Sequence, residues 1–250
     1  MLNAERKQRI IEVLEQDGVV KLVELVQQLN SSESTIRRDL IELEEKGLLE
    51  RVHGGAKLTN SHNSEPSMNE KSFKNIHVKR EMAKYSAKLI SEGDCIYLDA
   101  GSTTIELIPF LADKRVTVVT NGLEHVEKLV KLQIEAYLLG GKMKVHTKAV
   151  IGAIALDNLK NYHFNKAFIG TNAVHQNYGF TTPDIEEAYL KRSAHLASDA
   201  TFVLADHSKF TENKFAKMFA LKEATLITDT IPKNVKEKFI QNSKIIEVEK

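Results

Sequence analysis

The chain has 250 residues, of which 42% are hydrophobic and 28% charged, values that are typical of a folded globular protein and exclude a disordered or fibrous chain. Its apolar runs are far shorter than the roughly 18 residues of a membrane-spanning helix, and its charged start does not resemble a signal peptide, so we expect a cytoplasmic protein with no membrane partner. The formal net charge is only +1, so any nucleic-acid partner must be argued from where the basic side chains lie.

One polar segment divides the chain. Residues 59–75 contain only Met68 and Phe73 as large apolar side chains, a composition that predicts a linker. The linker separates a small amino-terminal domain, residues 1–58, from a larger carboxy-terminal domain, residues 76–250.

The amino-terminal domain is predicted to contain three helices and a hairpin. Apolar residues at helical spacing predict helices over residues 6–15 and 22–29, the first of them ending near Gly18. A third helix is predicted from an N-cap at Ser31 or Ser32 to about residue 46, ended by Gly47. Two short extended runs, 48–52 and 56–58, flank a glycine turn. This order predicts a winged helix-turn-helix.

The third helix has one apolar face and one polar face. Ile36, Leu40 and Leu43 fall on the first, whereas Arg37 and Arg38 fall on the second. Short hydroxyls bind phosphates, and guanidinium groups bind guanine or phosphate with two hydrogen bonds. We therefore predict contacts to double-stranded DNA from the amino-terminal end of this helix and from the hairpin, through Ser32, Ser34, Thr35, Arg37, Arg38, Arg51, His53 and Lys57. The alternative is a solvated helix whose arginines pair with Glu33, Glu42 or Glu45.

The carboxy-terminal domain has a different pattern. Extended apolar runs recur at residues 95–98, 116–119, 136–139, 167–169, 202–205, 226–227 and 245–248. Most are separated by helix-like stretches, at residues 81–90, 105–111, 123–132 and 186–198. This alternation predicts an α/β fold with a largely parallel sheet.

Small or polar residues follow these predicted strands. Because ligands of open parallel sheets bind beyond the carboxyl ends of the strands, we predict a small-anion site from Asp99, Gly101, Ser102, Thr103, Thr104, Thr120, Asn121, Gly140, Gly141, Gly170, Asp206 and Lys209. Residues 101–104 offer backbone N–H groups and hydroxyls to a phosphate, and Lys209 offers a balancing charge. Asp99 and Asn121 are predicted to hold sugar hydroxyls. The alternative is that these residues only form turns and helix caps.

No cofactor is predicted. The sequence has neither the lysine motif of a phosphate-binding loop nor the glycine pattern of a dinucleotide site. Of its nine histidines, the five at His146, His163, His175, His195 and His207 are scattered without the spacing of metal ligands.

Several of these motifs resemble one family. Residues 34–40, Ser-Thr-Ile-Arg-Arg-Asp-Leu, and 51–56, Arg-Val-His-Gly-Gly-Ala, resemble the signature of the DeoR family of bacterial transcription regulators. The motifs at residues 98–104, 118–121, 139–141, 167–170, 205–209 and 226–229 are similar to those of the family's sensor domain and follow in the same order. The resemblance extends from about Glu5 to Asp229.

The resemblance implies a function and a fold. DeoR proteins typically repress sugar-catabolic operons and release DNA when a phosphorylated sugar binds. Their sensor fold resembles that of ribose-phosphate isomerases. Similarity to fructose-operon regulators favours fructose 1-phosphate as the effector, with tagatose 6-phosphate and deoxyribose 5-phosphate as alternatives. Paired DNA half-sites require paired reading heads, so we expect a homo-oligomer, either a dimer or a tetramer.

The residues leave three alternatives open. The first is an isomerase-like enzyme in which Asp99, Asp206, Glu186 or Glu187 acts as a base beside Lys209. The second is a DNA-binding regulator whose carboxy-terminal domain only oligomerises. The third is an activator, because the sign of regulation depends on where the site lies relative to a promoter.

Overall fold

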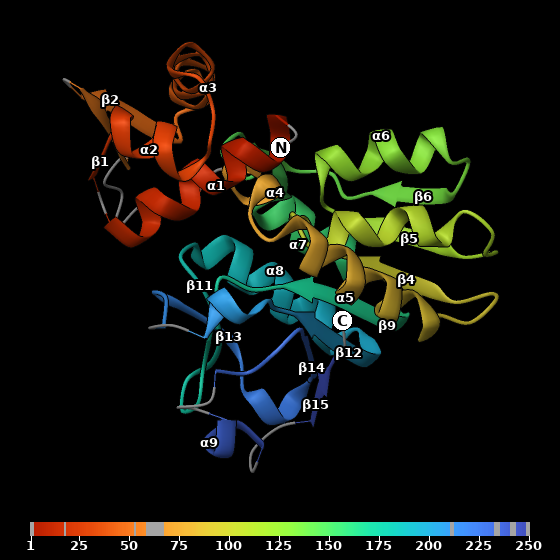
Figure 1. The fold of residues 1–250 in the computed structure, drawn as a ribbon. Coiled ribbons are helices and arrows are strands. Elements are labelled where there is room, and N and C mark those ends of the chain that lie inside the picture. Colours follow the sequence, from red (N-terminus) through yellow and green to blue (C-terminus); the bar gives the residue numbers. More distant parts are fainter. Residues whose placement is uncertain are drawn as a thin grey trace. The chain divides into compact units, whose positions relative to one another are not determined.

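The structure is a computed structural model that describes residues 3–17, 19–52, 54–58, 68–210, 213–232, 236–240 and 244–248 (Figure 1). It divides into two compact units, Met1–Lys74 and Asn75–Lys250, which we call the head unit and the body unit. Within the described ranges, no helix is long and apolar enough to cross a membrane, and no group of three His, Cys, Asp or Glu side chains is placed to hold a metal ion.

The head unit has the predicted three helices and hairpin. Its elements are α1 (Asn3–Asp17), β1 (Val19–Lys21), α2 (Leu22–Gln28), α3 (Glu33–Glu45), β2 (Leu49–Val52), β3 (Gly55–Leu58) and α4 (Met68–Phe73). Two elements were not predicted. Strand β1 pairs antiparallel with β3, so the hairpin becomes a three-stranded sheet in the order β1-β3-β2. Helix α4 lies within the predicted linker, so that segment is helical at residues 68–73.

Glycine is required where β1 meets the hairpin. A Cβ atom on Gly55 would lie 2.2 Å from the carbonyl oxygen of Val20, so a larger residue would separate the two strands. Gly54 has a φ of +80°, in the left-handed region that favours glycine. The two adjacent glycines thus allow the turn to bring β3 against β1.

The apolar and polar faces predicted for α3 are confirmed. Ile36, Leu40 and Leu43 are at most 3% exposed and belong to the core of the head unit, whereas Arg37 and Arg38 are exposed. Asp39 also lies on the buried face, with 1% exposure. Its carboxylate forms a two-fold hydrogen-bonded ion pair with the guanidinium of Arg6 in α1, with one N–O distance of 3.2 Å. This pair attaches α1 to the middle of α3.

The body unit contains the predicted parallel sheet. Its helices are α5 (Ile76–Lys88), η1 (a 3₁₀ helix, Thr104–Leu111), α6 (Leu123–Lys131), α7 (Ala153–Leu159), α8 (Ile185–Leu196), η2 (His207–Lys209), η3 (Leu221–Glu223) and α9 (Lys236–Ile240). Its strands are β4 (Cys95–Leu98), β5 (Thr117–Thr120), β6 (Glu135–Leu138), β7 (Lys142–Lys144), β8 (Ala149–Ile151), β9 (Phe164–Gly170), β10 (Ala173–His175), β11 (Gly179–Thr182), β12 (Ser198–Leu204), β13 (Ala216–Phe219), β14 (Thr225–Thr228) and β15 (Lys244–Glu247). Seven of these strands form one parallel sheet in the order β15-β14-β12-β9-β4-β5-β6, which confirms the α/β fold.

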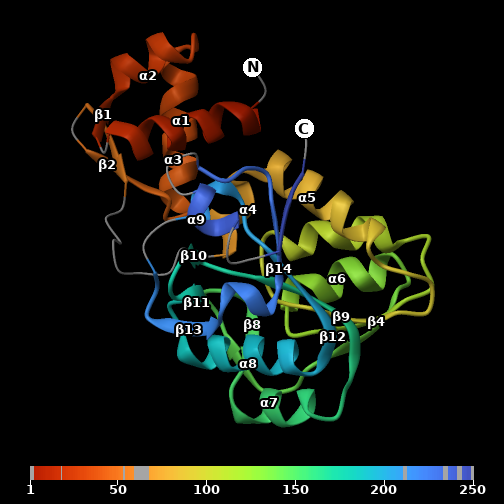
Figure 2. The same cartoon turned by 90° about the horizontal axis from the view of Figure 1, so that it is seen from below.

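Helices cover both faces of this sheet. Figure 2 shows α5 and α6 on one side and α7 and α8 on the other. Helix α5 contacts η1 and β14, whereas α8 contacts β9 and β12. Two small antiparallel sheets, β10-β11-β13 and β7-β8, were not predicted from the sequence. Because all strands of the main sheet run in one direction, their carboxyl ends lie at one edge, where the polar residues follow.

We predict that the Arg6–Asp39 pair stabilises the head unit. The Asp39→Ala substitution leaves the guanidinium of Arg6 without its carboxylate, which should cost about 2 kcal/mol because Arg6 retains some contact with water. Hydrogen exchange of the full chain, followed by mass spectrometry, should then show faster exchange in α1 and α3 and unchanged exchange in the body unit. Glu33→Ala removes a carboxylate from an exposed pair on the same helix and serves as the control. Equal protection of α1 in both variants would contradict the prediction.

Candidate DNA-binding surface and ligand site

Three predicted hydroxyls gather at the amino-terminal end of α3. Ser32 is the N-cap, and its Oγ accepts a hydrogen bond from the backbone N–H of Thr35 at 3.3 Å. The same oxygen lies 3.0 Å from Oγ of Ser34 and 2.8 Å from Oγ1 of Thr35. Ser32 and Ser34 are exposed. This end of the helix therefore presents hydroxyls together with the positive end of the helix dipole, a combination suited to a phosphate group.

Most of the predicted basic residues carry an ion pair within the head unit. The pairs are Arg37–Glu33 at 2.6 Å, Arg51–Glu44 at 2.6 Å and Lys57–Glu50 at 3.1 Å. Arg38 is exposed and makes no ion pair with the described residues. The predicted contact residue His53 lies outside the described residues. Pairs between exposed side chains are weak, so they do not prevent these cations from binding another anion.

At the edge of the main sheet, Asp99 joins three elements. It follows β4, is 1% exposed, and its Oδ2 accepts a hydrogen bond from the backbone N–H of Gly170 at 2.9 Å. The same oxygen forms an ion pair with Lys191 of α8, which also donates to the carbonyl oxygen of Gly170 at 3.2 Å. Burial raises the pKa of Asp99 above its usual value although the Lys191 charge opposes this. Asp99 and Gly170, both predicted site residues, are therefore brought together.

Asn121 and Thr120 form buried hydrogen bonds to the segments around this edge of the sheet. Oδ1 of Asn121 accepts hydrogen bonds from the hydroxyl of Tyr97 at 3.0 Å and from the N–H of Ala100 at 2.8 Å. Nδ2 of Asn121 donates to the carbonyl oxygen of Val150 at 3.1 Å. Oγ1 of Thr120 donates to the carbonyl oxygen of Leu98 at 2.6 Å. Both side chains are buried and use their polar atoms to hold neighbouring loops in place, which gives Asn121 a supporting role.

The glycine loop, residues 101–104, connects β4 to η1. Oγ of Ser102 accepts a hydrogen bond at 3.0 Å from Nζ of Lys79, a residue of α5 that is only 2% exposed. Oγ1 of Thr104 donates to the carbonyl oxygen of Asp99 at 2.6 Å. Thr103 is buried and Gly101 lies half-buried at the start of the loop. The loop is followed by a 3₁₀ helix that contains Pro109, where the sequence predicted a helix without specifying its type.

The aspartate loop, residues 206–209, follows β12 and contains η2. Asp206 is the N-cap of η2, is 1% exposed, and accepts a hydrogen bond at 2.9 Å from the N–H of Ser208. Burial opposes ionisation of Asp206, but the charge of Lys209, the hydrogen bonds from Ser208 and the charge of Lys79 outweigh it, so its pKa lies below the usual value. Lys79 therefore donates to Ser102 of the glycine loop, and its charge also lowers the pKa of Asp206 in the aspartate loop.

The remaining predicted residues, Gly140 and Gly141, form an exposed turn after β6. The N–H of Gly140 donates to Oδ1 of Asn158 at 2.9 Å. A Cβ atom on Gly141 would lie 2.8 Å from the carbonyl oxygen of Ile151. Close backbone packing therefore accounts for Gly141, whereas Gly140 is held by the side chain of Asn158.

Sequence reasoning missed the two buried lysines. Lys79 lies on the face of α5 that also buries Met82, Ala83 and Ser86, and Lys191 lies on the buried face of α8 with Ala188 and Ala194. The available signal is a charged residue at a position where helical spacing requires an apolar one. Such a residue must find a partner inside the protein.

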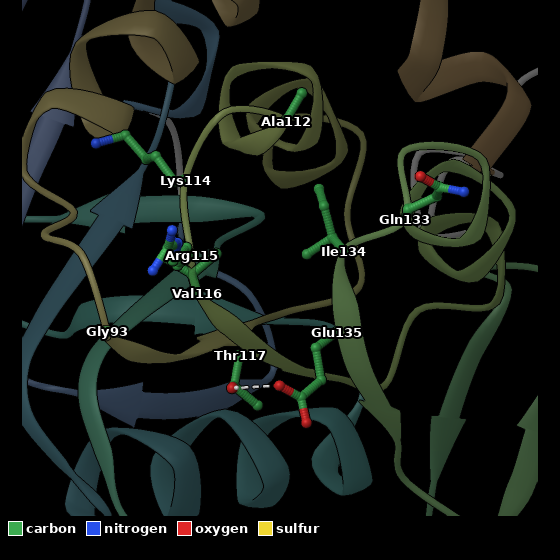
Figure 3. A pocket seen from close by; sticks show the side chains of 9 residues that line it. All are labelled: Gly93, Ala112, Lys114, Arg115, Val116, Thr117, Gln133, Ile134 and Glu135. Atoms are coloured by element: carbon green, nitrogen blue, oxygen red, sulfur yellow. Dashed lines mark hydrogen bonds between the residues drawn. The ribbon is translucent and has the colours of Figure 1, made fainter.

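A cavity of about 370 Å³ lies at the opposite edge of the main sheet (Figure 3). Its lining residues precede or begin β4, β5 and β6: Gly93, Ala112, Lys114, Arg115, Val116, Thr117, Gln133, Ile134 and Glu135. The amine of Lys114 donates to the carbonyl oxygen of Ile90 at 2.7 Å, and Thr117 bonds to Glu135. This cavity is at the amino-terminal ends of the strands and therefore is not part of the predicted ligand site.

Known proteins resemble both units. The DeoR-like helix-turn-helix domain matches residues 6–62, and the DeoR C terminal sensor domain matches residues 74–230. The HTH-type transcriptional regulator FruR of Bacillus subtilis, itself described as uncharacterized, is 50% identical over 229 residues, 91% of each chain. The lactose phosphotransferase system repressor of Staphylococcus epidermidis is 36% identical over 94% of this chain and 95% of its own. A solved ribose 5-phosphate isomerase A of Methanocaldococcus jannaschii aligns with a TM-score of 0.42 and 19% identity over 55% of each chain.

One buried histidine beside the glycine loop predicts a pH effect on stability. Nε2 of His125, in the first turn of α6, lies 3.2 Å from Oγ1 of Thr104, and its Nδ1 has no hydrogen-bond partner among the described residues. Burial lowers the pKa of His125 to about 3. The folded protein therefore keeps His125 neutral, whereas the unfolded chain takes up a proton below a pH of about 6.5. This contribution to stability is present at neutral pH and is lost as the pH falls.

Between pH 7 and pH 5 we expect this group to lower the free energy of unfolding by about 2 kcal/mol. Urea unfolding followed by circular dichroism at the two pH values should show that His125→Gln removes a loss of this size. His163→Gln, which changes an exposed histidine bonded to Asp199, should leave the loss unchanged. An identical pH dependence in wild type and His125→Gln would show that His125 is not the group responsible.

Proposed function

Because the chain belongs to the DeoR family of transcriptional regulators, we propose that it represses a sugar-utilisation operon and leaves its operator when a phosphorylated sugar binds the body unit. One observation carries the ligand half of this proposal. The first turn of α5 contacts both loops, because Lys79 donates to Ser102 of the glycine loop and Asn75 donates to Asp206 of the aspartate loop at the carboxyl ends of the strands. Hydroxyls, backbone N–H groups and lysine charges at this edge suit a phosphate.

The DNA half of the proposal assigns the contacts to the amino-terminal end of α3 and to the wing. Ser32, Ser34 and Thr35 would contact phosphates, and Arg37 and Arg38 would contact phosphates or guanine. Arg51 and Lys57 of the wing would add phosphate contacts. Because one head unit reads one half-site, the active regulator is a dimer or tetramer of this chain.

In the proposed sugar phosphate site, the phosphate contacts Gly101, Ser102, Thr103 and Lys209. Asp99, Thr120 and Asn121 position these groups through the hydrogen bonds described above. Fructose 1-phosphate is the first compound to test, because the sequence resembles fructose-operon regulators. The function is regulation without turnover of the sugar phosphate, as the names of the relatives suggest.

A mobility-shift titration tests the whole proposal. The full chain is titrated on the DNA upstream of its own operon at one stated salt concentration, because phosphate contacts make affinity steeply salt-dependent. Fructose 1-phosphate, other sugar phosphates and the unphosphorylated sugars are then added. Release by a phosphorylated sugar alone supports the proposal. DNA binding that ignores every compound would overturn the effector half, and loss of a phosphate group during incubation or isomer formation would point to an enzyme.

We expect Arg38→Ala to weaken operator binding by about tenfold or more, because a base or phosphate contact contributes roughly 1–3 kcal/mol. Binding of the sugar phosphate, measured by calorimetry on DNA-free protein, should be unchanged. Arg115→Ala, which removes an exposed arginine that precedes β5 at the amino-terminal edge of the main sheet, is the matched control. Equal operator affinity in Arg38→Ala and wild type would remove Arg38 from the DNA-binding surface.

We expect Lys209→Ala to leave operator affinity intact but to raise the sugar phosphate concentration needed for release by at least tenfold. The physical reason is the loss of one charge-assisted hydrogen bond to the phosphate. Lys222→Ala is the control, because Lys222 is an exposed lysine on η3 at the amino-terminal edge of β14. Normal release from Lys209→Ala would show that Lys209 does not contact the effector.

A further inference from the structure

Helix α5 begins at the boundary between the two units. The head unit ends at Lys74 and the body unit begins at Asn75, which directly precedes α5. Asn75 occupies the N-cap position, yet its side chain makes no capping hydrogen bond to α5. Instead, its Nδ2 donates at 3.1 Å to Oδ1 of Asp206, 131 residues away in the sequence. A residue that usually caps its own helix is here bonded to the aspartate loop.

The same oxygen of Asp206 also organises the aspartate loop. Oδ1 accepts hydrogen bonds from both the N–H and the hydroxyl of Ser208, and the carbonyl oxygen of Asp206 accepts the N–H of Lys209 at 2.9 Å. The conformation of the loop that carries Lys209 and the position of Asn75 therefore depend on one carboxylate. A change in the conformation of the aspartate loop therefore alters the hydrogen bond that holds Asn75.

A second contact attaches the first turn of α5 to the glycine loop. Lys79 lies four residues after Asn75, and its N–H donates to the carbonyl oxygen of Asn75 at 3.0 Å. Its ammonium group donates to Ser102, and its charge helps to keep Asp206 ionised. Both loops assigned to the phosphate are thus joined to the turn of helix that starts the body unit.

We infer that Asn75 is a positioning residue that couples effector binding to the segment leading to the head unit. A phosphate bound by Ser102 and Lys209 competes with Asp206 for Lys79 and Lys209, so the Asp206–Asn75 hydrogen bond differs in strength between the free and bound states. Because Asn75 is covalently joined to Lys74, this difference acts on the interdomain boundary. The inference rests on the proposed function, since it explains how the same effector site changes DNA affinity.

The left-handed backbone of Asn75 provides a clean test. Its φ is +54°, a conformation that glycine adopts without strain, so Asn75→Gly removes the amide and keeps the backbone. Asn75→Asp is the second variant: it keeps the shape of the side chain but replaces the N–H donor with a carboxylate. Asn161→Gly is the control, because within the described part of the chain the side chain of Asn161 bonds to the carbonyl oxygens of Asp157 and Asn158 in the last turn of α7.

Three quantities are measured on the full chain with fructose 1-phosphate, or with whichever sugar phosphate releases the wild type. They are the operator Kd, the Kd for the sugar phosphate without DNA, and the ratio of operator Kd values with and without saturating sugar phosphate. Asn75→Gly and Asn75→Asp should keep the first two within threefold and lower the ratio at least tenfold toward one. Asn161→Gly should behave as wild type in all three.

The outcomes separate the inference from the proposed function. A wild-type ratio in Asn75→Gly overturns the coupling role of Asn75 and leaves the proposed function standing. Loss of sugar phosphate binding in Asn75→Gly also overturns it, because Asn75 would then belong to the binding site itself. A wild type that no sugar phosphate releases overturns both.

Discussion

The candidate ligand site depends on the ion pair between Asp99 and Lys191. Asp99 directly follows β4 and Lys191 lies on α8, so the pair fixes a helix to the edge of the sheet. Through Gly170, which bonds to both charged groups, it also sets the end of β9. The carbonyl oxygen of the same aspartate accepts the hydroxyl of Thr104, which sets where the glycine loop starts. Because desolvation of two charges offsets much of their attraction, the pair is better understood as defining geometry than as adding stability.

The same construction occurs at several buried charged residues of the described helices, among them Glu187 of α8, which pairs with Lys144 of β7. Asp39, Lys79 and Lys191 each occupy a buried position on a helix, and each bonds to a polar partner on another element. In α3 the pair with Arg6 leaves the opposite face free for contacts. In α5 and α8 the lysines bring positive charge to the loops at the carboxyl ends of the strands. A charged residue on an otherwise apolar helical face therefore identifies, in this protein, the helices next to the proposed sites.

Periodicity was sufficient to predict much of the fold, but not the short elements or the partners. The parallel strands are apolar runs, and α3 has a strict separation of faces, so both were recognisable. Strand β11, Gly-Phe-Thr-Thr, is wholly buried yet contains two threonines, and β1 has only three residues, so neither has a detectable pattern. The partners of Asp39, Lys79 and Lys191 lie 33, 23 and 92 residues away, and no local signal pairs them. Asn121 was placed at the correct edge, but its supporting hydrogen bonds depend on the three-dimensional arrangement.

The charge distribution of the head unit explains how a domain without a basic excess would select its DNA in the proposed function. Arg37, Arg51 and Lys57 each have a glutamate partner in the free protein, at Glu33, Glu44 and Glu50. In the proposed complex, DNA phosphates would compete with those carboxylates for the cations, while the remaining acidic groups would repel the backbone of arbitrary DNA. Exposed ion pairs cost little free energy to break. An operator that also forms base contacts with Arg38 would therefore offset the free energy lost when these pairs break. In the proposed function, specificity would then arise from this internal competition between glutamates and DNA for the same cations.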